Sequence, residues 1–157
     1  MMRNLTLSLL AATPAALLCA LSAGAAKQPQ TPAAGAAQPV VYLGHEKVAA
    51  AFVKGGAMNE GDHYKVMAGR HDGPGGAEVH TVDTDVFYVL EGTATFITGG
   101  TVKDSHSTGA NEVRGSAIEG GQTHHLQKGD VIIIPKGVPH WFQETTPGFL
   151  YFVVKAH

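Results

Sequence analysis

Residues 129–144 of the 157-residue chain read GDVIIIPKGVPHWFQE, and this stretch decides the fold. Four consecutive β-branched residues at 131–134 end at a proline, which is typical of a strand covered on both faces. Pro135 fixes its own φ and Gly137 permits an unusual one, so a tight turn is predicted between them. A second short strand then carries His140. The sequence therefore places an imidazole just after a rigid turn between two strands.

The composition favours one β-rich globular domain. The chain has 20 glycines and 8 prolines, and its apolar runs are short, which favours strands and turns over a helical bundle. Hydrophobic residues make up 44% of the sequence, enough for one core. With 11 basic and 13 acidic residues, the chain has no basic excess for a phosphate backbone, which argues against a nucleic-acid partner.

The first residues have the pattern of an export signal. Arg3 gives a positive start, residues 5–21 form an apolar run interrupted by Pro14, and residues 23–25 are small, as a signal peptidase requires. We therefore expect residues 1–25 to be cleaved and the mature protein to be periplasmic or secreted, without stable membrane insertion. The alternative is an uncleaved membrane anchor.

A linker and a single domain are predicted after the signal. Residues 26–39 are rich in Pro, Ala and Gln, a composition that buries too little apolar surface to order itself, so they predict a flexible linker. The domain is predicted at 40–157. Residues 40–43 could form an edge strand, and residues 46–53 favour a short helix or a strand equally.

The remainder of the domain predicts strands at intervals of about ten residues, which favours a β-sandwich or barrel. An exposed polar insertion is predicted at 99–121, of the kind that often forms a lid or a rim. The expected strands lie at residues 64–69, 77–81, 85–90, 93–98, 122–127, 131–134 and 149–154.

Residues 78–92, EVHTVDTDVFYVLEG, contain side chains that could bind a metal together with His140. Glu78 and His80 are two positions apart on an expected strand, so their side chains leave the same face. A hairpin partner can bring Asp85 alongside, and His140 would come from a strand across the barrel mouth. Two imidazoles and up to two carboxylates suit Fe(II), Mn(II), Ni(II) or Zn(II).

The first stretch resembles the second motif of the cupin superfamily, G-x5-P-x-G-x2-H-x3-N. Gly129, Pro135, Gly137 and His140 match it at the stated spacing, while Glu144 stands where the family has Asn. This resemblance implies that His140 is a metal ligand.

The other stretch is similar, less closely, to the first cupin motif, G-x5-H-x-H-x3or4-E-x6-G. Asp85 and Gly92 match its end, with Asp in place of Glu. His80 then falls on the second His and Glu78 on the first, while the initial Gly is offset, with Gly73 nearest. Because Asp85 is one methylene shorter than Glu, it could be a ligand or could instead orient a His ring.

The resemblance, which covers about residues 60–155, implies an all-β cupin-type jelly-roll barrel or sandwich with a divalent transition metal. The implied ligands are Glu78, His80, Asp85 and His140. Similar cupins include dioxygenases, decarboxylases and isomerases, so we expect a metal-dependent enzyme that acts on a small oxygenated organic molecule. The alternatives are a non-catalytic module that binds a metal or small ligand, and a metal-free isomerase-like cupin with His80 or His124 as base.

His124 is the candidate for proton transfer. If Leu126 faces the core, His124 shares its face and could serve as general acid or base, whereas His125 points outward. Arg114 on the insertion could clamp an anionic substrate or be solvated. Surface positions are expected for the histidines without a partner at metal spacing, namely His45, His63, His71, His106 and His157.

A homodimer is also expected. Residues 40–43 and 149–154 are apolar and are predicted to form an exposed sheet edge, which a second copy could cover. Other aromatic residues are expected in the core or in that contact, namely Phe87, Tyr88, Trp141 and Phe142.

Overall fold

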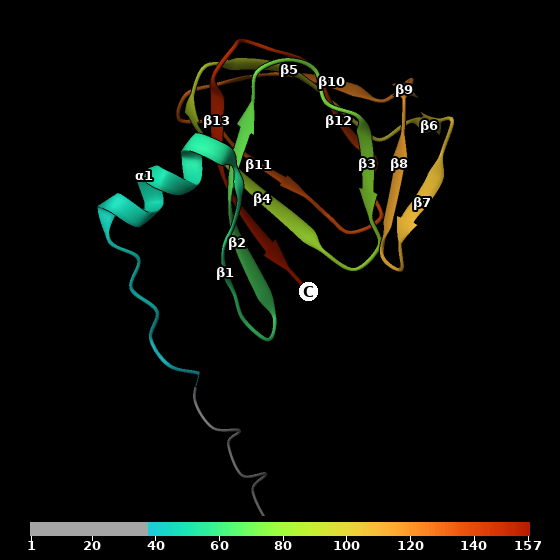
Figure 1. Cartoon of the computed structure of the whole chain (residues 1–157). Helices are drawn as coiled ribbons and strands as arrows, with labels where there is room; N and C mark the ends of the chain where they lie inside the picture. Colours follow the sequence, from blue (N-terminus) through green and yellow to red (C-terminus); the bar gives the residue numbers. More distant parts are fainter. Residues whose placement is uncertain (1–37) are drawn as a thin grey trace, which may run out of the picture. The chain divides into compact units, whose positions relative to one another are not determined.

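The computed structural model describes residues 38–157, which form a β-sandwich with a short helix (Figure 1). The expected signal at 1–25 and nearly all of the expected linker at 26–39 lie outside the described residues. No helix within 38–157 has the length and apolar character needed to cross a membrane. The elements are α1 His45–Lys54, β1 Gly56–Glu60, β2 Tyr64–His71, β3 Ala77–His80, β4 Thr84–Glu91, β5 Thr93–Thr98, β6 Thr101–Lys103, β7 His106–Gly109, β8 Glu112–Gly115, β9 Ala117–Glu119, β10 Gln122–Gln127, β11 Val131–Ile134, β12 His140–Thr145 and β13 Phe149–Ala156.

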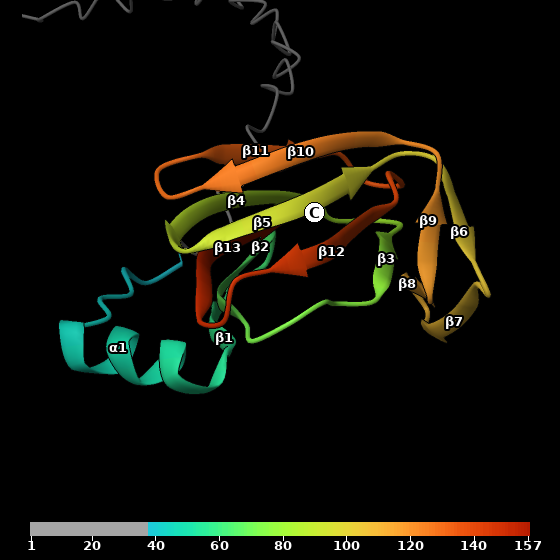
Figure 2. The same ribbon diagram turned by 90° about the horizontal axis from the view of Figure 1, so that it is seen from above.

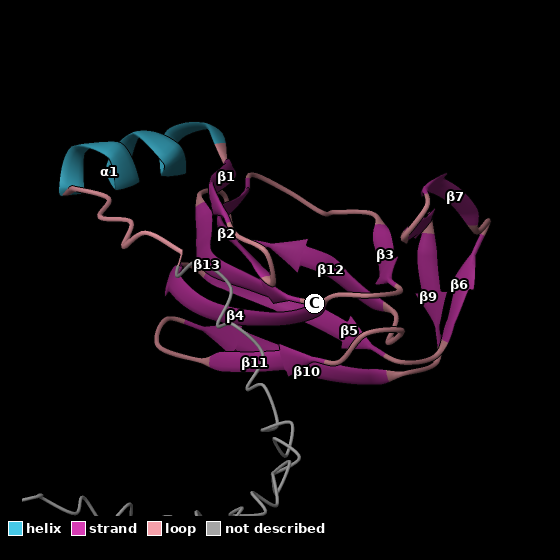
Figure 3. Ribbon diagram, turned by 90° about the horizontal axis from the view of Figure 1, so that it is seen from below, coloured by secondary structure: helices cyan, strands magenta, loops and turns pink. Residues whose placement is uncertain are grey.

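The strands pair antiparallel in two large sheets. The five-stranded sheet has the order β1-β2-β13-β4-β11, and the six-stranded sheet has the order β10-β5-β12-β3-β8-β7. Strands β6 and β9 form a separate two-stranded sheet. Helix α1 lies at one end of the sandwich beside β1, and the β6–β9 segment lies at the other end beyond β3 (Figures 2 and 3).

The core lies between the two large sheets and is dominated by aromatic rings. Phe96 and Phe149 are fully buried, and the Phe96 and Phe142 ring centroids are 4.5 Å apart. Phe87 and Tyr151 join them from the five-stranded sheet. Because successive side chains of a strand leave opposite faces, alternate residues of β4, β5, β12 and β13 supply this core.

The strand expected at 131–134 is present, but the expectation that both its faces are covered is wrong. Val131 and Ile133 are 59% and 61% exposed, and only Ile134 is fully buried, at 2%. Within residues 38–157, strand β11 lies at the edge of its sheet and pairs with β4 alone. A run of β-branched residues indicates a strand, but it does not indicate what covers each face.

The prediction that residues 40–43 and 149–154 form an exposed apolar sheet edge is also wrong. Strand β13, which contains residues 149–154, lies between β2 and β4 and is therefore central. Residues 40–43 form no strand, and the Val40 side chain is 98% exposed. Residues 46–53, which fitted a helix or a strand, belong to helix α1, which ends at Gly55 with a φ of 74°.

The insertion at 99–121 is not the loop that its polar composition predicted. It contains β6 to β9, and β8 pairs with β3 to extend the six-stranded sheet. This pairing sets Arg114 opposite Glu78 and Glu112 opposite His80. The insertion therefore contributes directly to the wall of the candidate site.

Candidate metal centre

Two transverse rows of polar side chains, one in each large sheet, lie at the same end of the sandwich. The histidine row runs His140, Glu78, Arg114 across β12, β3 and β8. The lysine row runs Lys65, Lys155, Asp85 across β2, β13 and β4. Side chains at directly paired positions leave the same face of a sheet, so each row presents its groups together.

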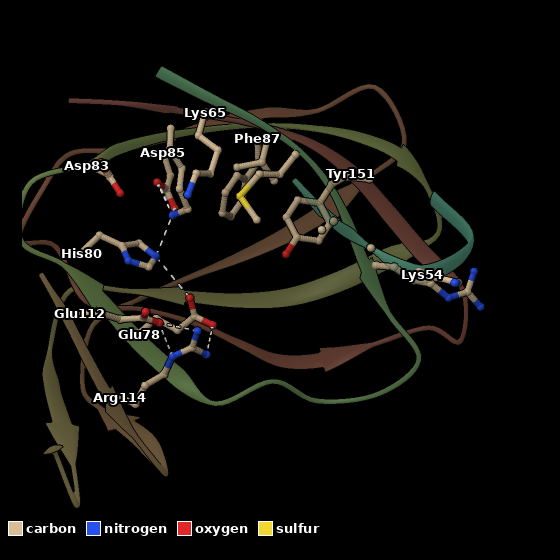
Figure 4. A pocket seen from close by; sticks show the side chains of 18 residues that line it. Lys54, Lys65, Glu78, His80, Asp83, Asp85, Phe87, Glu112, Arg114 and Tyr151 are labelled. Carbon is tan, nitrogen blue, oxygen red and sulfur yellow. Dashed lines mark hydrogen bonds and ion pairs between the residues drawn. The ribbon is translucent and has the colours of Figure 1, made fainter. Parts of the chain in front are cut away.

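Glu78, His80 and His140 form a compact cluster. Each offers one ligand atom, and these atoms all lie within 4.8 Å of one another. His80 Nε2 is 3.3 Å from Glu78 Oε2, and both imidazoles are buried. Figure 4 shows Glu78, His80 and Asp85 pointing toward a common point. The structure thus brings together three of the four ligands that the sequence predicted.

The tautomer of His140 is set by its backbone. His140 Nδ1 is 3.1 Å from the carbonyl oxygen of Val138, which can only accept, so Nδ1 carries the proton and donates it. Burial lowers the pKa of His140, although the Val138 carbonyl and the charges of Asp85 and Glu78 oppose this shift. The ring is therefore held neutral with Nε2 free to coordinate.

Glu78 is the half-buried carboxylate of the cluster. Burial raises its pKa, but the hydrogen bond from His80 and the charge of Arg114 oppose burial, and the net pKa is lowered. Arg114 Nη1 lies 2.5 Å from Glu78 Oε1, and the guanidinium also pairs with Glu112. One oxygen of Glu78 thus faces Arg114 while the other faces His80.

Asp85 faces the same cluster but is paired to a lysine. Its side chain is 2% exposed, and both its oxygens contact Lys155 Nζ, at 2.8 and 2.7 Å. Asp85 Oδ2 lies 3.5 Å from His80 Nε2 and 3.8 Å from His140 Nε2. Asp85 therefore stands beside both imidazoles, where either of its predicted roles is sterically available.

A cavity of about 620 Å³ opens beside the cluster. Glu78, His80, Asp85 and Arg114 line it, together with both lysines of the lysine row. Its volume is that of a site for a small organic molecule. A second cavity of about 20 Å³, lined in part by Glu78 and His140, has room for about one water or ion.

The cluster fits a divalent transition metal on the chemistry of its donors. It offers two imidazole nitrogens and one carboxylate oxygen, a set used by open metal sites that keep positions for a ligand. The neutral His140 ring and the ionised Glu78 are the forms that coordinate a metal. These residues therefore fit the group that the sequence predicted, without selecting among Fe, Mn, Ni and Zn.

His124 lies apart from this cavity. It shares a face with Leu126 as expected, while His125 is exposed. Its Nε2 is 2.8 Å from Thr98 Oγ1, and His124 is absent from the residues that line the 620 Å³ cavity. Thr98 pairs with His140 across β5 and β12, so His124 is one residue removed from the cluster.

The surface position expected for His71 is wrong. His71 is half-buried, its ring stacks on Tyr151, and its Nε2 lies 3.2 Å from the Tyr151 hydroxyl. Burial raises the pKa of Tyr151, so this hydroxyl stays protonated and points into the cavity (Figure 4). The Tyr151 ring lies over Gly69, where an added Cβ would meet it at 2.4 Å. The other four histidines of that group are exposed.

Among the cavity residues that the sequence did not indicate are Lys65, Lys155 and Tyr151. A signal for two of them exists in the last strand. Residues 149, 151, 153 and 155 alternate on one face, so a strand whose Phe, Tyr and Val point inward also points Lys155 inward. Recognising Lys65 requires knowing that β2 pairs with β13.

The motifs, the sandwich and the cluster agree with the comparison to known families. The family model described as Cupin matches residues 73–157, so the chain belongs to the cupin family. A search of curated proteins finds no match.

Solved structures with a similar fold come from several bacteria. KdgF from Halomonas sp. is 12% identical, with 65% of this chain and 77% of that chain covered and a TM-score of 0.44. A cupin-2 domain containing protein from Shewanella frigidimarina is 20% identical, with coverages of 66% and 80% and a TM-score of 0.43. The DMSP lyase DddQ from Ruegeria pomeroyi is 16% identical, with a TM-score of 0.47, and the match covers 66% of this chain and 46% of DddQ.

Proposed function

We propose that this cupin is an exported, metal-dependent enzyme that acts on a small oxygenated organic molecule by dioxygenase-, decarboxylase- or isomerase-type chemistry. The observation that carries the proposal is the cluster of Glu78, His80 and His140, whose ligand atoms lie within 4.8 Å of one another beside a cavity of about 620 Å³. Buried ligands next to a space of this size are what a metal-assisted reaction of a small substrate needs.

A divalent metal held by Glu78, His80 and His140, with Asp85 as a further candidate ligand, would supply a Lewis acid for a substrate oxygen. The chain's own groups prepare that position. The Val138 carbonyl fixes the His140 ring, and Arg114 fixes one oxygen of Glu78. Phe87 and Tyr151 are buried and form part of the cavity wall.

Proton handling at the cavity would fall to groups that line it. The Tyr151 hydroxyl points inward and can donate a hydrogen bond to a substrate oxygen. The sequence-based proposal of His124 as general acid or base would require a relay through Thr98, its hydrogen-bond partner.

The first test is elemental analysis of the protein purified without added metal. We expect about one transition metal per chain in the wild type and a loss of most of it in His140→Ala and Glu78→Gln. His125→Ala is the matched control, because His125 is an exposed histidine away from the cavity and should leave the metal content unchanged. A wild-type protein that is metal-free and cannot be loaded would contradict the proposal.

A second candidate function is a non-catalytic module that binds a small ligand. The carboxylates of the site already have cationic partners within the chain, since Asp85 pairs with Lys155 and Glu78 with Arg114. Every buried side-chain nitrogen and oxygen within residues 38–157 also has a hydrogen-bond partner. Turnover distinguishes the two functions. An enzyme converts its substrate, whereas a binding module takes up its ligand stoichiometrically and releases it unchanged.

We retain export as a part of the proposal that rests on the sequence pattern alone. We retain a homodimer as a part that rests on the resemblance to cupins, because β13 is central and does not form the predicted edge. Fractionation of cells that produce the full chain should place a shortened protein outside the cytoplasm. Sedimentation of the purified protein should give twice the mass of the mature chain.

A further inference from the structure

The lysine row sets two ammonium groups side by side on the wall of the cavity. Lys65 and Lys155 are directly paired across β2 and β13, and both line the cavity with Asp85, the next residue of the row. Like charges at directly opposite positions disfavour folding unless something compensates them. Asp85 compensates Lys155, because both its oxygens contact Lys155 Nζ.

Lys65 has a much weaker partner. Among residues 38–157 its ion pair is with Glu60, at 3.1 Å, and the Glu60 side chain is 62% exposed. Exposed pairs of this kind contribute only about 0–1 kcal/mol, because water and salt screen them. Lys65 can therefore exchange Glu60 for an anion in the cavity at little cost. Lys155 also has three donors, and its contacts with Asp85 leave one for a ligand.

The charges around the cavity favour the same sign of ligand. Five cationic side chains and four carboxylates line it. One of these carboxylates is Glu78, a ligand of the proposed metal, whose bound cation would leave the lining more positive still. A cavity with net positive charge and partly buried walls attracts small anions.

The spacing of the groups limits the length of that anion. Asp85 Oδ2 lies 2.7 Å from Lys155 Nζ and 3.5 Å from His80 Nε2, so only the Asp85 carboxylate lies between the Lys155 ammonium and the His80 imidazole. A molecule of a few carbon atoms can therefore reach both. Figure 4 shows Lys65 and Asp85 on one side of the cavity and Glu78 and Arg114 on the other.

We propose that the cavity takes a small organic acid, whose carboxylate binds between Lys65 and Lys155 while its hydroxyl or carbonyl oxygen faces Glu78 and His80 of the metal cluster. The binding of the carboxylate depends on the lysine row alone. The position of the hydroxyl or carbonyl oxygen rests on the proposed function, because it places that oxygen at the metal centre.

The test uses calorimetric titration with three probes: L-malate, its uncharged diamide, and inorganic phosphate. Malate should bind the purified wild type, and the diamide should bind at least about tenfold more weakly, because it cannot form charge-assisted hydrogen bonds with the lysines. Lys65→Gln should weaken malate binding about tenfold. Lys128→Gln is the matched control, because Lys128 is an exposed lysine that pairs with Glu91 and lies outside the cavity.

Repeating the titrations after chelation separates this inference from the metal function. Malate binding that persists without metal and is lost in Lys65→Gln supports the lysine site even if the metal proposal fails. Equal binding of malate and its diamide, or an unchanged Lys65→Gln, would overturn the inference while a metal-loaded protein keeps the proposed function. Phosphate that binds more tightly than malate would overturn the choice of a carboxylic acid.

Discussion

The two ends of the sandwich interior are built from the same strands and differ in kind. In the five-stranded sheet the lysine row of Lys65, Lys155 and Asp85 is followed, two residues along each strand, by Met67, Val153 and Phe87. In the six-stranded sheet His140 is followed by Phe142, which pairs with Phe96. One step of two residues therefore separates the charged groups from the apolar side chains that lead into the aromatic core.

The difference shows that residues important for stability and residues that line the candidate site occupy neighbouring rows of the same strands rather than separate segments of the chain. The apolar rows contact each other across the two sheets, with Phe96 fully buried, and Met67, Phe87 and Val153 also form part of the cavity wall. The polar rows face a cavity and keep their charges in pairs. Substitutions in one row should thus change unfolding, and those in the other should change ligand binding, with one informative exception.

The largest effect on stability should come from the apolar side. Phe96→Ala removes a fully buried ring that packs on Phe87 and Phe142, and we expect a loss of about 3–5 kcal/mol in the free energy of unfolding. Urea denaturation of the metal-free protein measures it. Tyr88→Ala, an aromatic truncation at a 45% exposed position of β4, is the control and should cost far less. Similar losses in both variants would show that this core is not the source of stability.

The exception is the buried ion pair of the lysine row. Lys155→Met leaves Asp85 buried without its partner, and we expect a loss of about 3 kcal/mol, close to that of a core truncation. Lys65→Met should cost under about 1 kcal/mol, because its pair with Glu60 is exposed. The double variant Lys155→Met with Asp85→Asn should recover part of the loss. Equal effects of the two single lysine substitutions would contradict the assignment of the buried pair.

Glu78 should show the separation of roles most clearly. Its side chain is 27% exposed and pairs with a 39% exposed Arg114, so Glu78→Gln should cost under about 1 kcal/mol in the metal-free protein. The same variant is expected to lose its metal, so thermal melts with and without metal should converge. Glu119→Gln, which breaks an exposed pair with Lys103, provides the control and should keep both metal and stability. A Glu78→Gln protein that retains metal would contradict the role of Glu78 as a ligand.

The smallest effect concerns His71, whose half-buried ring packs against Phe142 and Tyr151. Burial lowers its pKa, and this outweighs the opposing charges of Glu78 and Asp72. The unfolded chain therefore binds the proton more readily, and stability should fall as the pH decreases from about 6.5 toward the folded pKa. The thermal midpoint should drop by a few degrees more in the wild type than in His71→Gln.

The comparison between these two proteins isolates His71, because their other titrating groups are the same. Melts at about pH 7.5 and about pH 5.5 lie on either side of the histidine pKa in the unfolded chain, below which the stability is expected to fall. An identical pH dependence in the two proteins would show that the His71 ring is solvated.

The sequence predicted those parts of the site that depend on local periodicity. Glu78 and His80 share a face because they are two apart on a strand, and His140 follows the turn at Gly137, whose φ is 79°. The β-sandwich follows from the spacing of strands and turns. These features need no knowledge of which strand pairs with which.

What the sequence could not provide is the order of the strands. The lysine row exists because β13 inserts between β2 and β4, although residues 149–154 have the composition of an exposed edge. For the same reason Val131 and Ile133 are exposed although their strand reads as buried. Arg114 was recognised as a possible clamp, but its pairing with Glu78 depends on β8 joining β3. Each error concerns neighbours distant in sequence.

The central position of β13 also determines when the domain can fold. Since β13 follows the other strands of residues 38–157 and separates β2 from β4, the five-stranded sheet cannot close until β13 has been synthesised. Until then β2 and β4 have open edges, which invite pairing with other chains. Asp85 likewise lacks its ion-pair partner until Lys155, seventy residues later in the sequence, has been synthesised. The domain is therefore open to aggregation until β13 is available, and a chaperone that holds the chain has its greatest value over that interval.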